Sequence, residues 1–240
     1  MPSMEPAPVD PRWPQLLSLA VHEFRTPMTV VAGYIRMLLK DRAGPVSDQQ
    51  RRLLEEAEKS CTRLSALLTE MSELGALEKG AATFNKSGVD LRALLRDAAA
   101  GLPEITDREV RVEVSTGDGA ATLQGDPIRL RAAFTSVLYG LRRELVASPR
   151  LLVRESIRRD GGRTVSWIAI GDEEQIDALQ AAAPDALTPF DEWRGGVGLS
   201  LAIARRVVNA HGGTMWSPAN GAKAAAVIMI PIESRPDSNC

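Results

Sequence analysis

The sequence predicts an α+β protein in which an antiparallel helical hairpin precedes an α/β-sandwich domain. Apolar residues recur at helical spacing through two long segments before residue 80, whereas alternating segments typical of strands are mixed with helices after residue 88. The 240 residues suffice for one large domain or two small ones. The expected parts are a flexible N-terminus at 1–14, the hairpin at 15–80, a linker at 81–88, the sandwich at 89–233 and a tail at 234–240.

Composition narrows the class of protein. The net charge is −2 and no basic block occurs, so nucleic acid is not an expected partner. Two cysteines, Cys61 and Cys240, are too few for a disulfide framework. No stretch approaches the roughly 20 apolar residues that span a bilayer, and the proline-rich start lacks the pattern of a secretory signal. We therefore expect a soluble cytoplasmic protein without a membrane partner.

The first helix is predicted over residues 15–43. Pro27 lacks an amide proton and is expected to kink this helix. Gly44 suits its C-terminal cap, and Pro45 prevents continuation. The apolar residues at helical spacing are Leu16, Leu19, Ala20, Phe24, Val31, Ile35, Leu38 and Leu39.

The second helix is predicted from Ser47, which forms a capping-box pattern with Gln50, to about Leu77. Steps of three and four residues alternate along its apolar positions, as in a packed helical seam. A short turn between two long helices indicates an antiparallel hairpin. One hairpin buries only part of its apolar surface, so we expect two copies to pair into a four-helix bundle as a homodimer.

After residue 88 the elements become short and mixed. Asp90 caps the first predicted helix, and Asp160-Gly161-Gly162 is a hairpin signal between two strands. Helices are predicted at 90–102, 126–145 and 198–210, and strands at 109–116, 150–159, 163–171, 214–216 and 224–232.

The six residues HEFRTP, from His22 to Pro27, place several reactive groups on the first helix. A metal site is not indicated, because no second His or Cys lies at ligand spacing. If His22 points outward, Glu23 can orient the imidazole and accept its proton as a ring nitrogen attacks an electrophile. Thr26 shares their face, and its hydroxyl can position a water. A buried core histidine is the alternative.

This segment resembles the H-box of the sensor histidine kinases of two-component systems, in their dimerization and phosphotransfer subfamily. The resemblance implies that His22 accepts a phosphoryl group and that Glu23 is its acid/base partner. It implies that Glu23 and Thr26 form the E-x-x-T pattern linked to dephosphorylation of a response regulator, and that Pro27 is the helix-kinking proline. The implied partners are a second copy, a response regulator receiver domain and, as a further candidate, another histidine kinase.

The second region is similar to the Bergerat-type ATP-binding domain of this family, whose cofactors are ATP and magnesium. GDPIRL at 125–130 resembles the start of the N-box helix, GGVGLSLAIARRVVNAHGG at 195–213 resembles the G2 box, and TPF at 188–190 resembles the F-box. Glycines before a helix let backbone amides approach phosphates, a role that suits Gly196 and Gly198. The resemblance assigns the adenine-binding carboxylate to Asp172 and a phosphate contact to Arg143. It makes His211 a helix terminator.

Several residues depart from the pattern of the family. Ser136 and Gly140 stand where the N-box has its two asparagines, and a glycine offers no side-chain ligand to magnesium. Glu174 and Ile176 replace the two glycines of the G1 box, and negative charge beside a polyanion site is unfavourable. The alanine-rich segment at 177–187 lies where a mobile ATP lid is expected, so we predict a short, helical or partly disordered lid.

Three hypotheses follow. The favoured one is a phosphotransfer protein in which His22 exchanges a phosphoryl group with an aspartate of a response regulator, while ATP binds weakly or not at all. The alternatives are an active ATP-dependent histidine autokinase and a non-catalytic adaptor that binds a regulator. Whether the chain is an enzyme depends on which hypothesis holds.

Overall fold

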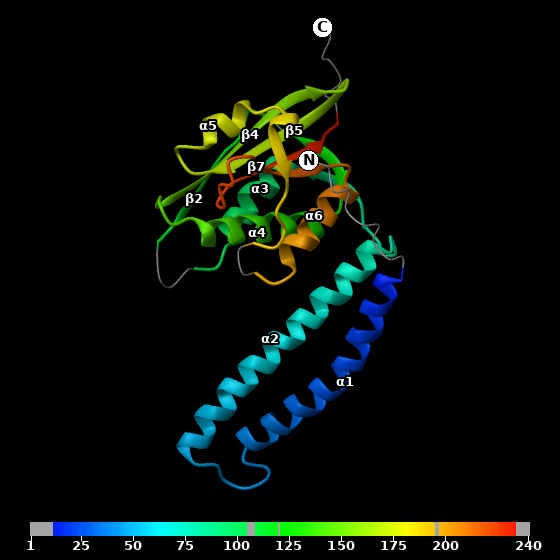
Figure 1. Cartoon of the computed structure of the whole chain (residues 1–240), viewed down its shortest axis with the longest axis vertical. Helices are drawn as coiled ribbons and strands as arrows, with labels where there is room; N and C mark the ends of the chain where they lie inside the picture. The colour runs from blue at the N-terminus through cyan, green and yellow to red at the C-terminus, as the bar shows by residue number, and fades with distance from the viewer. Residues whose placement is uncertain (1–11, 105–108, 120, 195–196, 234–240) are drawn as a thin grey trace, which may run out of the picture. The chain divides into compact units, whose positions relative to one another are not determined.

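The computed structural model describes residues 12–104, 109–119, 121–194 and 197–233, and it divides into two compact units, 1–82 and 83–240. The predicted flexible N-terminus lies almost wholly outside the described residues, and the predicted tail and Cys240 lie outside them altogether. The first unit is a hairpin of two antiparallel helices, α1 (Trp13–Leu39) and α2 (Asp48–Glu78), as the sequence predicts (Figure 1). Among the described residues, no helix has both the length and the apolarity to cross a membrane.

The hairpin closes along one side of α1. Leu17, Val21, Ala32 and Ile35 are its buried side chains, and their spacings of four, eleven and three residues place them on one stripe. Ala32 and Ile35 pack against Cys61 of α2, so this cysteine is a small core residue.

Several apolar residues of α1 remain exposed, as expected for a single hairpin. Leu16 is 55%, Leu19 60%, Phe24 59% and Val31 47% exposed. With a rotation of about 100° per residue, Leu16 and Leu19 lie at least 100° around the helix from the Leu17–Ile35 stripe, whereas Phe24 and Val31 lie along its border. A single hairpin therefore covers only part of the apolar surface of α1.

The end of α1 differs from the prediction. The helix ends at Leu39, not at residue 43, and Asp41 adopts the left-handed conformation, with φ of 54°. The amide of Arg42 then donates to the carbonyl of Met37 at 3.0 Å, which closes a Schellman-type cap. Gly44 is therefore not the cap. Arg51 of α2 fixes this turn by donating to both carboxylate oxygens of Asp41, each at 3.0 Å.

The start of α2 confirms the predicted capping box. The Ser47 hydroxyl accepts from the Gln50 amide at 3.3 Å, and the Gln50 side chain accepts from the Ser47 amide at 2.8 Å. Two of the amides that a helix N-terminus leaves without partners are thereby satisfied.

The second unit is an α/β sandwich around a six-stranded sheet of order β2-β4-β5-β8-β7-β6. β2 and β4 are parallel, and every other neighbouring pair is antiparallel. Its elements are β1 (Ser87–Asp90), α3 (Leu91–Ala100), β2 (Arg111–Ser115), β3 (Thr122–Gly125), α4 (Pro127–Glu144), β4 (Arg150–Asp160), β5 (Arg163–Gly171), α5 (Ile176–Ala181), a 3-10 turn (Pro184–Ala186), β6 (Leu187–Pro189), α6 (Ser200–Ala210), β7 (Thr214–Pro218) and β8 (Ala226–Pro231).

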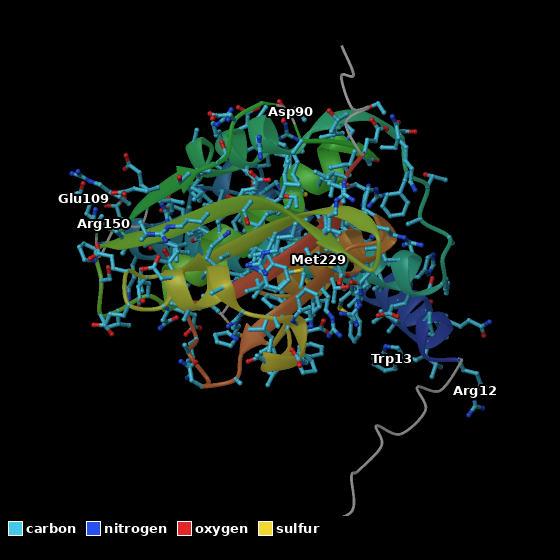
Figure 2. The ribbon with its side chains drawn as sticks, turned by 90° about the horizontal axis from the view of Figure 1, so that it is seen from above. Arg12, Trp13, Asp90, Glu109, Arg150 and Met229 are labelled. Atoms are coloured by element: carbon cyan, nitrogen blue, oxygen red, sulfur yellow. The ribbon has the colours of Figure 1, made fainter. Side chains whose placement is uncertain are left out.

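The layers of the sandwich are unequal. α3, α4 and α6 cover one face of the sheet, and the short helix α5 lies on the other (Figure 1). Alternation along β5 separates the two faces: Trp167 and Ala169 pack with α5, while Ile168 and Ile170 are buried on the opposite side. The parallel strands β2 and β4 start at the same edge, where Figure 2 labels Glu109 and Arg150.

One strand pair of this unit was predicted from the sequence, and another was not. β4 and β5 join through Gly161 and Gly162, whose φ values of 52° and 80° suit the predicted two-residue hairpin turn. β1 pairs with β3 in a separate two-stranded ribbon that was not predicted, so the expected linker 81–88 already becomes a strand at Ser87. Four-residue strands are too short to show a clear alternation.

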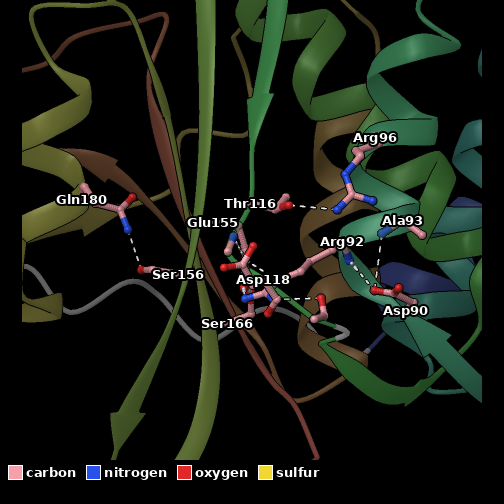
Figure 3. A network of polar contacts seen from close by, with 12 residues as sticks. Asp90, Arg92, Ala93, Arg96, Thr116, Asp118, Glu155, Ser156, Ser166 and Gln180 are labelled. Atoms are coloured by element: carbon pink, nitrogen blue, oxygen red, sulfur yellow. Dashed lines mark hydrogen bonds and ion pairs between the residues drawn. The ribbon is translucent and has the colours of Figure 1, made fainter.

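A buried ion pair joins the helical layer to the sheet. Arg92 of α3 donates to Glu155 of β4 at 2.7 Å, and their side chains are 3% and 0% exposed (Figure 3). Glu155 also accepts from the Ser166 hydroxyl at 3.0 Å and from the Gly117 amide at 3.3 Å. Removing one partner of such a pair typically costs about 3–5 kcal/mol, because it leaves the other charge buried alone. The network therefore ties α3, β4, β5 and the segment after β2 together.

Candidate functional site

The H-box residues lie on the open surface of α1. The His22 and Glu23 side chains are 79% and 71% exposed, and Nδ1 of His22 lies 3.3 Å from Oε1 of Glu23. The outward orientation that phosphotransfer needs is therefore present, and the buried-core alternative for His22 is excluded. With the Nδ1 proton directed to the carboxylate, Nε2 keeps its lone pair for attack on an electrophile.

Thr26 and Pro27 follow one turn further along the exposed surface of α1. Thr26 is four residues from His22 and three from Glu23, the separations at which helical side chains are neighbours. Pro27 lies inside the helix and has no amide proton, so the carbonyl of Glu23 lacks its usual helical donor. The three predicted catalytic residues thus share one accessible patch, which can receive a phosphoryl group brought by a partner.

In the second unit, Asp172 is engaged in local structure. Its side chain is buried at the end of β5, and Oδ1 accepts from the amides of Glu174 and Gln175 at 3.1 and 3.0 Å. The other oxygen, Oδ2, lies 3.4 Å from the Gln175 side-chain amide. This carboxylate therefore caps the turn into α5 through Oδ1, while Oδ2 keeps acceptor capacity beyond its 3.4 Å contact.

The two N-box positions lie on α4, and neither carries an asparagine. Ser136 is half-buried, while Gly140 lies in the contact between α4 and α6. A Cβ at position 140 would stand 3.4 Å from both δ-carbons of Leu201, a fully buried residue of α6. An apolar side chain thus packs where the family pattern places a magnesium ligand.

The residues expected around the phosphates are only partly present. Gly198 has φ of 69° just before α6, a conformation that favours glycine, as the G2 pattern predicts. Gly196 lies outside the described residues. The hydroxyl of Ser200, at the third G2 glycine position, donates to the carbonyl of Val197 at 2.9 Å. Arg143 is exposed, and its guanidinium lies 5.8 Å from the ring centre of Tyr139.

The first part of the predicted lid is helical and packs on the sheet, because α5 ends at Ala181 and a 3-10 turn and β6 follow. Ile176, at the second G1 glycine position, and Leu179 are buried against Trp167, Ala169 and Val227. The indole of Trp167 donates to the carbonyl of Leu179 at 3.1 Å. α5 therefore belongs to the hydrophobic core on the face opposite α4 and α6, because its isoleucine and leucine are buried there. The short lid predicted at residues 177–187 is therefore anchored to the sheet at Leu179.

The segment before α6 is held by charged groups that the sequence did not reveal. Glu192 is buried and pairs with Arg205 at 3.1 Å and with Arg206, both on α6. Arg194 donates to the carbonyls of Lys223 and Ala225 at 2.8 and 3.1 Å. Both anchors lie outside the helical and alternating patterns from which burial can be predicted.

The second histidine is structural, as predicted. The imidazole of His211 contacts the carbonyl of Val207 through Nδ1 at 2.7 Å, and Nε2 accepts from the amide of Asp126 at 2.9 Å. Asp126 in turn caps α4 by accepting from the amides of Ile128 and Arg129. His211 thereby joins the end of α6 to the start of α4.

The stability of this junction is expected to depend on pH. Burial lowers the pKa of His211, with Lys86 acting in the same direction, while the carbonyl of Val207 and the Asp126 carboxylate oppose the shift. Since the unfolded chain then binds the proton more readily, stability is fully present above the ordinary histidine pKa of about 6.5 and falls as pH drops through the lowered value.

Urea unfolding at pH 7.5 and 5.5 tests this expectation. The His211→Asn variant should be less stable at pH 7.5 and should lose most of the pH dependence. The His22→Ala variant, which removes the exposed histidine, should keep it. Equal pH dependence in the wild-type chain and the His211→Asn variant would contradict the assignment.

At three positions of the nucleotide-binding pattern, the described residues either lack a side chain or are engaged in other contacts. Gly140 offers no ligand, Asp172 caps its own turn and Ile176 is part of the core. Within the described ranges, no three His, Cys, Asp or Glu side chains are grouped so that they could hold a metal ion.

Comparison with known families identifies the hairpin. Residues 14–80 match the family described as His Kinase A (phospho-acceptor) domain. The matched range contains α2 entire, nearly all of α1, and the patch formed by His22, Glu23 and Thr26.

Curated relatives cover most of the chain. The circadian input-output histidine kinase CikA of Synechococcus elongatus is 25% identical over an alignment of 244 positions. The alignment covers 92% of this chain and 31% of that protein. The sensor protein GacS of Pseudomonas syringae is 25% identical over 228 residues, which cover 90% of this chain and 25% of that protein. The chain thus spans about a quarter to a third of the length of these relatives.

Two solved structures share the fold. Full-length ShkA, in complex with AMPPNP, aligns with a TM-score of 0.66 and 24% identity over 92% of this chain and 46% of that one. The Acinetobacter baumannii histidine kinase AdeS aligns with a TM-score of 0.52 and 17% identity over 90% of this chain and 98% of that one. The similarity confirms a helical hairpin followed by a Bergerat-type sandwich.

Proposed function

We propose that this chain, a relative of the sensor histidine kinases, is a phosphotransfer protein of two-component signalling. The premise is that it carries their phospho-acceptor domain over residues 14–80. His22 accepts a phosphoryl group from an aspartate of a response regulator receiver domain and returns it to the same or another regulator, as in a phosphorelay. The observation that carries the proposal is the exposed pair of His22 and Glu23, 3.3 Å apart, within the matched domain.

The transfer step uses the residues of the patch. Nε2 of His22 attacks the phosphorus, and the bond between phosphorus and the aspartyl oxygen breaks with its electron pair remaining on the aspartate. The ring acquires positive charge as the N–P bond forms, and Glu23 stabilises that charge at Nδ1 and can accept the proton. Thr26 positions a water for the competing dephosphorylation of the regulator.

We infer that the sandwich binds ATP weakly or not at all, and so serves as a pseudokinase domain. Three features support this inference: the Leu201 side chain packs against Gly140, the Asp172 carboxylate caps its own turn, and α5 packs on the opposite face of the sheet.

The hairpin is proposed to work as a homodimer. Leu16, Phe24 and Val31 are exposed along one side of α1, and a second hairpin can bury them in a four-helix bundle. The receiver domain would then approach the remaining outer surface, where His22 stands. Another histidine kinase remains the second candidate partner.

An ATP-dependent autokinase is the second candidate function, favoured by the similarity to a histidine kinase and by Gly198 before α6. The test uses the purified full chain, receiver domains labelled with radioactive phosphate, and labelled Mg-ATP. We expect acid-labile label on the chain from at least one receiver and none from Mg-ATP. Label from Mg-ATP alone would indicate the autokinase, and no label from either source would leave a non-catalytic adaptor.

A further inference from the structure

The segment that joins the two units is held at both of its ends. On the hairpin side, the amide of Ala82 donates to the carbonyl of Ala76 at 3.2 Å, so the chain there still caps α2. On the sandwich side, Phe84 and Asn85 contact groups at the start of α4 and the end of α6. Thr83 lies between these two anchors. It is exposed, and within the described part of the chain it makes no hydrogen bond.

The Phe84 ring bridges the ends of two helices. The imidazole of His211, at the C-terminal cap of α6, meets the ring at 88° with ring centres 5.3 Å apart. The guanidinium of Arg129, in the first turn of α4, lies over the same ring at 5.2 Å from its centre. Both distances are typical of favourable edge-to-face and cation–π contacts. The side chain of Phe84 is therefore held by α4 and α6 together.

The backbone of Asn85 is fixed at the same place. Its amide donates to Oδ2 of Asp126 at 2.9 Å, while Oδ1 of that carboxylate caps α4. The Asp126 amide donates in turn to Nε2 of His211 at 2.9 Å. Burial raises the pKa of Asp126, but its three amide donors outweigh burial and leave the pKa lowered, so the acceptor is ionised. Hydrogen bonds to an ionised acceptor are stronger than those between neutral groups.

We propose that Phe84 and Asn85 form a latch, which controls how freely the hairpin and the sandwich move relative to each other. While the latch is closed, rotation between the α2 cap and the sandwich is confined to Thr83. When it opens, residues 83–86 become free, because β1 begins at Ser87. Four extended residues span at most about 14 Å, against about 3.5 Å for one.

The latch couples this freedom to the arrangement of α4 and α6. Its closing groups belong to the start of one helix and the end of the other, so separation of these ends opens it. By linkage, opening of the latch loosens the junction between the two helices. This coupling does not require His22 to be phosphorylated.

The experiment measures opening of the latch in the full chain. Exchange of the Asn85 amide proton with deuterium, followed by NMR, reports the fraction of molecules in which its hydrogen bond is open. The variants are Phe84→Ala and Arg129→Ala. The matched control is Arg158→Ala, which removes a guanidinium 4.1 Å from the ring centre of Trp167 in the same unit.

We expect the Asn85 amide to exchange about tenfold faster in Phe84→Ala and about threefold faster in Arg129→Ala, because loss of each ring contact favours the open latch. In Arg158→Ala it should exchange at the wild-type rate. The amide of Glu174, which donates to a carboxylate elsewhere in the sandwich, should exchange alike in all four chains. Its rate distinguishes local opening from general loss of stability.

A second measurement tests the control of movement. Relaxation of 15N nuclei gives separate rotational correlation times for the amides of the hairpin and of the sandwich. Phe84→Ala should shorten the correlation time of the sandwich relative to that of the hairpin, because a longer free segment lets the units tumble more independently. Arg158→Ala should leave the ratio unchanged.

Three outcomes would overturn the inference. Unchanged exchange at Asn85 in both latch variants would show that the ring contacts do not hold the linker. Equally faster exchange at Asn85 and Glu174 would show general destabilisation only. Faster exchange at Asn85 with an unchanged ratio of correlation times would show that the latch does not control movement. Arg129→Ala keeps both measurements decisive if Phe84→Ala does not fold.

Discussion

Replacement of His22 by alanine should abolish phosphoryl acceptance and leave the fold intact. The imidazole supplies the nucleophile, and no other side chain of the patch can form a phosphoramidate. Because the His22 side chain is 79% exposed, its removal creates no cavity and should change the free energy of unfolding by less than about 0.5 kcal/mol. The measurement is transfer of labelled phosphate from a receiver domain to the full chain, with size-exclusion chromatography and thermal unfolding alongside.

The matched control is Ser18→Ala. Ser18 is exposed one turn before His22 on the same side of α1, and the Ser18→Ala variant should retain wild-type transfer.

The transfer rate of Glu23→Gln should lie between those of the wild-type chain and His22→Ala, since loss of an acid/base group typically costs a factor of about 100 or more and the nucleophile remains. Labelling of the His22→Ala chain at the wild-type rate would place the acceptor elsewhere and defeat the central assignment.

Local patterns predicted the parts of this molecule that local interactions determine. The capping box at Ser47 and Gln50 and the turn at Gly161 and Gly162 depend on residues a few positions apart, and the structure confirms both. The predicted end of α1 was four residues too late, because an aspartate, Asp41, adopts the left-handed conformation that glycine usually adopts at a helix end.

Burial was harder to predict where charge and long-range packing decide it. Glu155 lies on the inward series of β4 with Leu151 and Val153, so the alternation alone placed a carboxylate in the core. Its partner Arg92 is 63 residues earlier, and only the fold brings the two together. A buried Glu155 could have been predicted from period two, whereas the identity of its partner could not.

The candidate site also contains one part that local sequence patterns predict and one part that long-range packing decides. The H-box is a contiguous segment, so the shared face of His22, Glu23 and Thr26 follows from helical spacing. The nucleotide positions depend on segments far apart in the chain. The sequence indicated that Gly140 had lost a ligand, but not that Leu201 packs there. Nor did it indicate that Asp172 would be used as a cap.

Isothermal calorimetry with Mg-ATP should detect no binding tighter than about millimolar, which is about 4 kcal/mol less than a micromolar site provides. A nucleotide would find the Asp172 carboxylate already engaged as a cap through Oδ1 and would find no side-chain magnesium ligand at Gly140. Mg-ATP at concentrations below its dissociation constant should also leave the unfolding temperature nearly unchanged, because a ligand stabilises the folded state appreciably only when its concentration exceeds that constant.

The Gly140→Asn variant tests whether the missing magnesium ligand alone explains the weak binding of Mg-ATP. We expect no recovery, because a Cβ at this position would already be in van der Waals contact with Leu201 at 3.4 Å, which leaves little space for the asparagine amide beyond it. Overpacking of this kind typically destabilises by about 1–3 kcal/mol, so the variant should unfold at lower temperature. The double variant Gly140→Asn/Leu201→Ala provides the space and separates crowding from loss of the ligand. Micromolar heat of binding from the wild-type chain would defeat the pseudokinase proposal and would make ATP the source of the phosphoryl group on His22.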